Sequence, residues 1–183
     1  MNIIFMGMKH CGKTSVGKKI ARELNHPFFD LDDLVVEQYR VQYGHKKGVE
    51  DIFREEGASI FYRIEAYTFN HFSKHEAQLH EEFVLSLGGR TPLNPLLGKS
   101  LEQCGYCIYI NTPFESIRDR IMKKGTSVLV QNNNPVQYLK ELYDIRHPVY
   151  SKRAHWCIDG GGTVDEITKR ILIQIKELQH GGK

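Results

Sequence analysis

The feature that most constrains this chain is a glycine-containing loop between an apolar segment and a helix-forming segment. The loop spans Gly7–Thr14 (GMKHCGKT) and directly follows the apolar run Ile3–Met6. Backbone N–H groups of such a loop, together with the N-terminus of the helix behind it, bind phosphate groups. Lys13 can then reach the outer phosphates, and the Thr14 hydroxyl can hold Mg²⁺. A plain glycine-rich turn is the alternative, but the amphipathic pattern of 13–24 favours a site for ATP or GTP.

Strand-like and helix-like segments alternate along the chain, which is typical of an α/β fold with helices on both faces of a parallel sheet. Strands are predicted at residues 2–7, 27–30, 83–87, 107–111 and 156–159. Helices are predicted at 13–24, 31–40, 57–78, 93–103, 114–123, 136–153 and 164–179, with a short helical turn at 51–53. A chain of 183 residues can bury a core of its own, so we expect one domain over 1–183.

In one segment, residues 123–135, the apolar residues follow neither a helical nor a strand spacing, and the segment ends in turn-forming asparagines. Long aperiodic segments inside compact domains are usually functional or disordered. Because a phosphate loop lies elsewhere in the chain, we expect this segment to be a mobile lid.

The composition favours small-molecule ligands. A net charge of +3 is too small to indicate a nucleic-acid or membrane partner. No apolar stretch approaches a membrane span, and the phosphate loop begins too early for a signal peptide to precede it. We therefore expect a cytoplasmic protein, and a monomer.

Two further groups of residues could carry chemistry, and a plainer interpretation is favoured for each. Cys104 and Cys107 have the spacing of a redox motif, but they lead into a predicted strand, which favours a place in the core. His71 and His75 are one helical turn apart, with His80 beyond. No acidic or thiol partner at helical spacing completes a metal site there, which favours a solvated face.

Acidic side chains follow the second predicted strand, in the segment Phe29-Asp30-Leu31-Asp32-Asp33. The carboxyl end of a parallel strand faces the same side of the sheet as the phosphate loop, where ligands of such folds bind. One carboxylate of the pair Asp30 and Asp32 can take a magnesium-bound water, while the other accepts a hydrogen bond from an acceptor hydroxyl. This arrangement suits phosphoryl transfer. The alternative is that these acids cap the next helix, a role that suits Asp33.

Taken together, the motifs resemble those of the shikimate kinase family, in the same order and over nearly the whole chain. They are Gly7–Thr14 followed by Ser15-Val16-Gly17, Phe29–Asp32, Val49–Gly57, Phe61–Glu65, Leu85–Gly89 and Arg146–Tyr150. The resemblance implies a P-loop kinase fold, with a three-layer α/β/α arrangement and a five-stranded parallel sheet in the order 2-3-1-4-5. It also implies Mg²⁺- and ATP-dependent phosphorylation of shikimate, a step in aromatic amino-acid biosynthesis. The acceptor-binding region would lie at about 31–65.

The resemblance also implies roles for individual residues. Lys13 and Asp32 would be catalytic. Thr14 would bind Mg²⁺ directly and Asp30 would do so through water. The nucleotide would be bound by His10, Cys11, Gly12, Lys13, Thr14, Ser15 and Arg120, and the acceptor by Asp32, Gly88, Gly89 and Arg146.

The chain departs from the family pattern near the acceptor and the transferring phosphate. Tyr62 stands where the family has an arginine for the shikimate carboxylate, and Arg63 points about 100° away on a helix. The family carries a turn of three glycines, and here the turn consists of Gly88, Gly89 and Arg90 (the glycine turn), so Arg90 replaces its third glycine. Ser127 replaces an arginine of the lid. Our hypothesis is that Arg90 binds the shikimate carboxylate in place of the arginine missing at position 62. Lys123 or Lys124 could serve the phosphates in place of the lid arginine, or both could be solvated.

Two other functions stay open. The first is a related kinase with a different small anionic acceptor, such as gluconate. The second is a nucleotide-binding protein whose catalysis has weakened. Arg146 favours shikimate phosphorylation over the first of these alternatives, since it still implies an anionic acceptor. The presence of Lys13, Asp30 and Asp32 together argues against a loss of catalysis.

Overall fold

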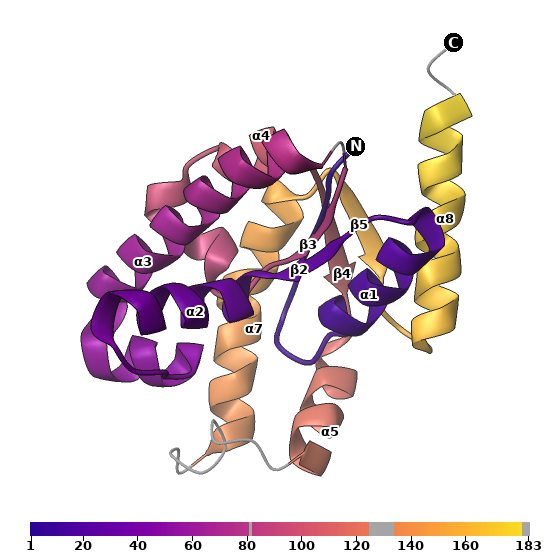
Figure 1. The fold of residues 1–183 in the computed structure, drawn as a ribbon. Coiled ribbons are helices and arrows are strands. Elements are labelled where there is room, and N and C mark those ends of the chain that lie inside the picture. The colour runs from indigo at the N-terminus through magenta and orange to yellow at the C-terminus, as the bar shows by residue number, and fades with distance from the viewer. Residues whose placement is uncertain (81, 125–133, 181–183) are drawn as a thin grey trace.

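A parallel β-sheet forms the centre of the computed structural model, which describes residues 1–80, 82–124 and 134–180 (Figure 1). Within these residues, five strands pair in the order β2-β3-β1-β4-β5. The strands are β1 (Ile3–Met6), β2 (Phe28–Asp30), β3 (Val84–Ser86), β4 (Tyr106–Asn111) and β5 (Trp156–Asp159). The predicted strands and the predicted strand order are confirmed, with each strand bound within one residue of its predicted place.

The central strand β1 is buried along its whole length. Its residues pair with β3 on one side, with Ile3 opposite Val84, and with β4 on the other, with Ile3 opposite Tyr106. A strand covered on both faces has no polar side to alternate with, which explains the continuous apolar run in the sequence. The parallel register brings the carboxyl ends of β1, β2 and β3 to one edge of the sheet.

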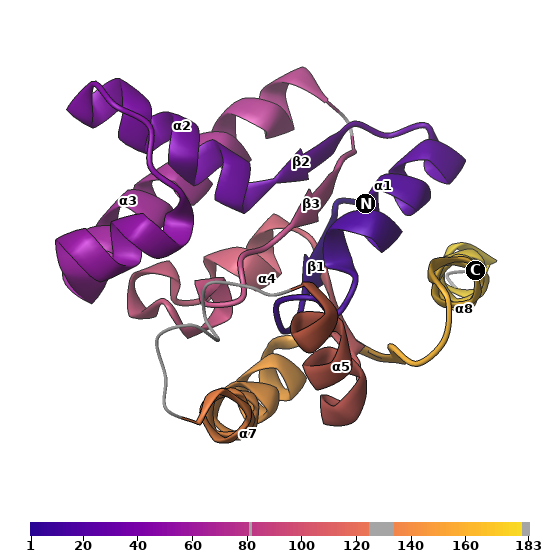
Figure 2. The same cartoon turned by 90° about the horizontal axis from the view of Figure 1, so that it is seen from below.

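Helices cover both faces of the sheet and confirm the predicted three-layer arrangement (Figures 1 and 2). On one face α1 (Lys13–Leu24) packs against α8 (Val164–His180). On the other face α7 (Pro135–Arg153) contacts β4 and packs against α5 (Phe114–Lys124). Between 124 and 134 lies most of the expected lid, including Ser127, and this part of the prediction falls outside the described residues. No described helix has the length and apolar character needed to cross a bilayer.

The helices that follow β2 form a projecting unit beside the sheet (Figure 2). They are α2 (Leu31–Tyr43) and α3 (Val49–Leu79). Gly57 interrupts α3 with φ 81° and ψ 164°, a conformation that glycine adopts without strain. The first part of α3, ahead of Gly57, is longer than the helical turn predicted at 51–53. Burial of Ile52 and partial burial of Phe53 anchor this extra helix to the core.

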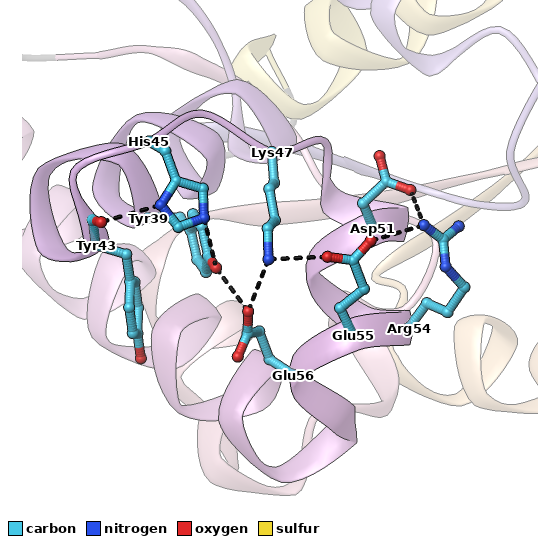
Figure 3. Close-up of polar contacts among 8 residues, drawn as sticks. All are labelled: Tyr39, Tyr43, His45, Lys47, Asp51, Arg54, Glu55 and Glu56. Carbon is cyan, nitrogen blue, oxygen red and sulfur yellow. Dashed lines mark hydrogen bonds and ion pairs between the residues drawn. The ribbon is translucent and has the colours of Figure 1, made fainter.

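A polar cluster ties the end of α2 to the first part of α3 (Figure 3). The Tyr39 hydroxyl donates to Glu56 Oε1 over 2.6 Å, and Lys47 Nζ donates to the same oxygen over 3.0 Å. Lys47 also pairs with Glu55 at 2.8 Å, and its ammonium lies 5.5 Å from the centre of the Tyr39 ring. These carboxylates raise the pKa of Lys47. The cluster therefore fixes the segment between α2 and α3 within the expected acceptor-binding region.

The prediction of one helix over residues 93–103 is wrong. The structure has two short 3-10 turns, Thr91–Leu93 and Pro95–Leu97, and then α4 (Ser100–Cys104). Pro95 has no backbone N–H to continue a helix, and the Asn94 side chain instead accepts a hydrogen bond from Leu96 N over 3.0 Å. Gly98, with φ 48° and ψ −121°, breaks the segment again before α4 begins.

The structure supports the plainer interpretations of the cysteines and histidines. Burial raises the pKa of the Cys104 thiol to about 11 and that of Cys107 to about 12, the opposite of a reactive thiolate. His71 and His75 are exposed, with ring centroids 6.0 Å apart. Among the described residues no three side chains of metal-binding type gather into a site.

Candidate active site

A cavity of about 880 Å³ opens at the carboxyl ends of β1, β2 and β3. The phosphate loop forms one part of its wall, and α3, the glycine turn and α7 form the other. All of the predicted site residues line it: His10, Cys11, Gly12, Lys13, Thr14, Ser15, Asp30, Asp32, Gly88, Gly89, Arg90, Arg120 and Arg146. The structure thus brings the predicted nucleotide and acceptor residues into one cavity, although they come from distant segments of the chain.

The phosphate loop is held in shape by contacts to its carbonyl groups. Arg120 Nη1 donates to His10 O over 3.1 Å and to Cys11 O over 3.2 Å. Lys13 Nζ folds back and donates to Gly7 O over 2.9 Å, so that this ammonium is largely buried. At Gly7, where φ is 148°, an added Cβ would lie 2.9 Å from Cys11 Sγ. The family resemblance implies that Arg120 binds the nucleotide, and the structure adds that its guanidinium braces the loop.

A hydroxyl and a carboxylate meet where the sequence predicts the magnesium site. Thr14 Oγ1 donates to Asp30 Oδ2 over 2.8 Å, and Asp32 N donates to Asp30 Oδ1 over 3.1 Å. The second bond makes Asp30 the N-cap of α2, a role that the sequence favoured for Asp33. Because two hydrogen bonds aim the Asp30 carboxylate, its oxygens are fixed beside the loop. A hydroxyl and a carboxylate fit Mg²⁺, which takes oxygen ligands and few of them from protein.

Asp32 lies deeper, against the glycine turn. Burial and the neighbouring negative charge of Asp30 raise the pKa of Asp32 to about 6, while Lys13 and Lys9 act in the opposite direction. Gly88 leaves room for this carboxylate, because an added Cβ would overlap Asp32 Oδ1 and lie 3.3 Å from Asp32 Cγ. A carboxyl group with this pKa can accept a proton near neutral pH.

Glu65 is a buried site residue for which the sequence indicated no individual role. Its carboxylate accepts hydrogen bonds from Thr91 Oγ1 over 2.7 Å and from Asn94 Nδ2 over 2.9 Å. Burial outweighs these bonds and raises the pKa of Glu65 to about 7. The side chain is 1% exposed and lines the cavity, so it anchors the segment after the glycine turn. Glu65 follows the buried Phe61 by one helical turn, so both residues lie on the same face of α3. This spacing is the signal from which the burial of Glu65 could have been predicted.

Two arginines gather at the acceptor end of the cavity. Arg146 of α7 is 7% exposed, and Arg90 packs its guanidinium 4.1 Å from the centre of the Phe53 ring. Burial and the positive charge of Arg146 lower the pKa of Arg90. Arg63 is exposed and does not line the cavity, as the helical geometry predicts. Tyr62 is partly buried, with its ring centroid 6.3 Å from that of Phe53.

The glycine turn connects these parts. The buried Tyr150 hydroxyl donates to Gly89 O over 2.6 Å and fixes the turn against α7. An added Cβ at Gly89 would lie 3.4 Å from Arg146 Nη1 and 3.6 Å from Lys9 N. The phosphate loop, the glycine turn and the Arg146 guanidinium therefore approach one another closely at this point of the cavity.

Comparison with known proteins places the chain in one family. The family model for shikimate kinase matches residues 9–176. The shikimate kinase of Dechloromonas aromatica is 32% identical over 163 residues, which cover 89% of this chain and 83% of the relative. That of Burkholderia thailandensis is 30% identical and covers 96% of this chain and 90% of the relative.

A solved structure agrees with these relatives. The shikimate kinase of Acinetobacter baumannii, in complex with shikimate, superposes with a TM-score of 0.80 at 30% identity, covering 100% of this chain and 95% of that one. The sheet order, the position of the phosphate loop and the full-length match lead to the same conclusion. This chain belongs to the shikimate kinase family.

Proposed function

We propose that this protein transfers the γ-phosphoryl group of ATP to the 3-hydroxyl group of shikimate. The observation that carries the proposal is the pairing, in one cavity, of a phosphate loop with a buried carboxylate and two arginines. The Asp32 carboxylate can accept a hydrogen bond from a hydroxyl group of the acceptor, and Arg90 and Arg146 can bind a carboxylate of the acceptor. The family membership and the shikimate bound to the Acinetobacter relative support the same acceptor.

The nucleotide binds along the loop from His10 to Ser15. Backbone N–H groups and the start of α1 hold the phosphates, and the Lys13 ammonium exchanges the carbonyl groups of Gly7 and Met8 for phosphate oxygens. Arg120 keeps the loop in shape and lies at the edge where the adenine binds. Thr14 and Asp30 would hold Mg²⁺, which would supply neutralisation of the negative charge on the outer phosphates.

Asp32 orients the acceptor hydroxyl and takes its proton. In the transfer step the hydroxyl oxygen forms a bond to the γ-phosphorus atom, and the bond from that phosphorus to the bridging oxygen breaks. The bridging oxygen keeps the electron pair and leaves as part of ADP, while the hydroxyl proton moves to the Asp32 carboxylate. A pKa of about 6 keeps most of this carboxylate ionised at pH 7, ready to accept the proton.

The shikimate carboxylate lies between Arg146 and Arg90. Burial, and after it the positive charge of Arg146, lowers the pKa of Arg90, and an anion shared by the two guanidinium groups would offset the repulsion between them. Arg90 thus replaces the arginine that the family carries at position 62. The Gly89 backbone faces the same part of the cavity.

The test is a coupled assay of ADP release with shikimate, quinate and gluconate offered as competing acceptors. We expect shikimate to give the highest kcat/KM. A preference for gluconate would identify a kinase with a changed acceptor, and nucleotide binding without acceptor-dependent turnover would identify a weakened enzyme. Either result would refute the proposal.

The proposed state of the protein is a cytoplasmic monomer with one domain over 1–183. Light scattering at assay concentration measures the mass in solution, and a mass near the 21.2 kDa of the chain is expected. A stable dimer at that concentration would contradict this part of the proposal.

A further inference from the structure

Lys9 is a cation of the phosphate loop that none of the steps above uses. Its side chain is half-exposed, and its ammonium donates to Glu50 Oε1 of α3 over 2.5 Å. Both residues line the cavity. The ion pair therefore spans the cavity from the phosphate loop to the acceptor-binding region.

Lys9 lies on the wall of the cavity that also contains the two reacting sites. Lys9 and Lys13 line this cavity from the phosphate loop, and Asp32 lines it from the start of α2. The backbone N of Lys9 would lie 3.6 Å from a Cβ at Gly89, where the loop meets the glycine turn. The Lys9 side chain therefore starts where the phosphate loop meets the glycine turn, and the Asp32 carboxylate lies against Gly88 of the same turn.

Arg54 also lines the cavity, and it pairs with Asp51 and Glu55 of its own helix at 2.6 Å and 2.9 Å. Three other cations of the cavity have no carboxylate partner among the described residues. Lys13 and Arg120 hold loop carbonyl groups, and Arg90 packs on Phe53. Lys9 is held by one carboxylate at a partly exposed site, and ion pairs of this kind contribute little to stability. A phosphoryl group in transfer presents three negatively polarised equatorial oxygens next to the charged phosphates of the nucleotide, so it can compete with Glu50 for the Lys9 ammonium.

We propose that Lys9 is a catalytic residue that leaves Glu50 and contacts the equatorial oxygens of the phosphoryl group during transfer. Glu50 is its partner in the resting protein. This inference rests on the proposed function for the identity of the acceptor, but not for the interaction with the phosphoryl group, which any acceptor at Asp32 would require.

The first experiment compares steady-state kinetics of Lys9→Met, Lys9→Arg and the wild type. Lys19→Met is the matched control, because Lys19 forms an ion pair of the same length, 2.5 Å, with Asp165 outside the cavity. We expect Lys9→Met to lower kcat at least about tenfold with both KM values within about threefold. Lys9→Arg should recover most of the rate, and Lys19→Met should match the wild type. A wild-type kcat in Lys9→Met would overturn the proposal, and a rise confined to the shikimate KM would assign Lys9 to acceptor binding instead.

The second experiment needs no acceptor. Binding of ADP with aluminium fluoride, which imitates the transferring phosphoryl group, is compared with binding of ADP alone. Lys9→Met should weaken the fluoride complex at least about tenfold and ADP by less than about twofold. Glu50→Gln frees Lys9 and should tighten the fluoride complex. If both variants weaken it equally, the pair is structural and the proposal fails.

The two experiments separate the two proposals. If the wild type shows no turnover of shikimate but Lys9→Met fails to bind the fluoride complex, the proposed acceptor is wrong and the role of Lys9 stands. If the wild type phosphorylates shikimate and Lys9→Met equals it in both assays, the role of Lys9 is refuted and the proposed function stands.

Discussion

Replacing Gly88 with alanine tests whether the position of Asp32 depends on the glycine turn. The new methyl carbon would overlap Asp32 Oδ1 and would lie 3.3 Å from Asp32 Cγ and 3.0 Å from Thr91 Oγ1. The φ of Gly88 is not in the positive range, so the alanine backbone is unstrained and the effect is steric. Asp32 and Thr91 approach the methyl group together, so the simplest relief is a movement of the Asp32 carboxylate.

The size of the effect follows from these distances. Relieving the overlap requires the carboxylate to move by about 1 Å, since carbon atoms in good contact lie at about 3.5–4.0 Å. A misplacement of this size at a reacting group lowers the rate by about 100-fold. Overpacking of the buried turn should also lower the free energy of unfolding by about 1–3 kcal/mol. We therefore expect Gly88→Ala to lower kcat/KM by about 100-fold and to remain folded.

The assay is acceptor-dependent ADP release, with urea unfolding followed in parallel. Gly89→Ala is the matched control for the turn, because the nearest protein atom to its methyl group is the flexible end of Arg146 at 3.4 Å. This control should keep its stability and chiefly raise the shikimate KM. A kcat/KM for Gly88→Ala within about threefold of the wild type would show that Asp32 does not need its observed position.

The remaining predictions concern the proton, the acceptor and the turn. Because the pKa of Asp32 is about 6 and its ionised form is the base, kcat/KM should fall about tenfold per pH unit below pH 6. Asp32→Asn should lose most of its activity, and the residual activity should lack this acid limb. Arg90→Ala should raise the shikimate KM at least about tenfold, and an unchanged KM would show that Arg90 does not bind the carboxylate. Tyr150→Phe removes the donor to Gly89 O and should lower the free energy of unfolding by about 1–2 kcal/mol in urea, whereas unchanged stability would show that water replaces the bond.

The sequence predicted the sheet well because apolar runs and turn residues mark buried parallel strands clearly. It predicted the helices less well where proline or glycine residues interrupt a helical spacing of apolar residues. The pattern at 93–103 is helical in spacing, yet Pro95 and Gly98 break it into turns. The sequence predicts that a helix starts at Gly57, whereas in the structure α3 extends on both sides of a kink at this residue.

The candidate site could be predicted where its residues lie close together in the sequence. The phosphate loop and the Asp30–Asp32 pair each come from one short segment, and both line the cavity as expected. The hydrogen bonds of Glu65 could not be predicted, because its partners Thr91 and Asn94 follow a different strand. The Lys9–Glu50 pair likewise depends on how far α3 extends ahead of Gly57, and the sequence underestimated that extension.

Phe53 connects positions 62 and 90, the two positions near the acceptor where the sequence departs from the pattern that the family resemblance implies. Its ring lies 6.3 Å from the ring of Tyr62 and 4.1 Å from the guanidinium carbon of Arg90. A guanidinium stacked on an aromatic face keeps its charge while its flat sides avoid water, which makes a partly buried arginine tolerable beside Arg146. An aromatic residue at 62 strengthens this apolar support, whereas an arginine there would place a third guanidinium next to the other two. We therefore propose that Tyr62 and Arg90 are coupled through Phe53, which contacts both side chains.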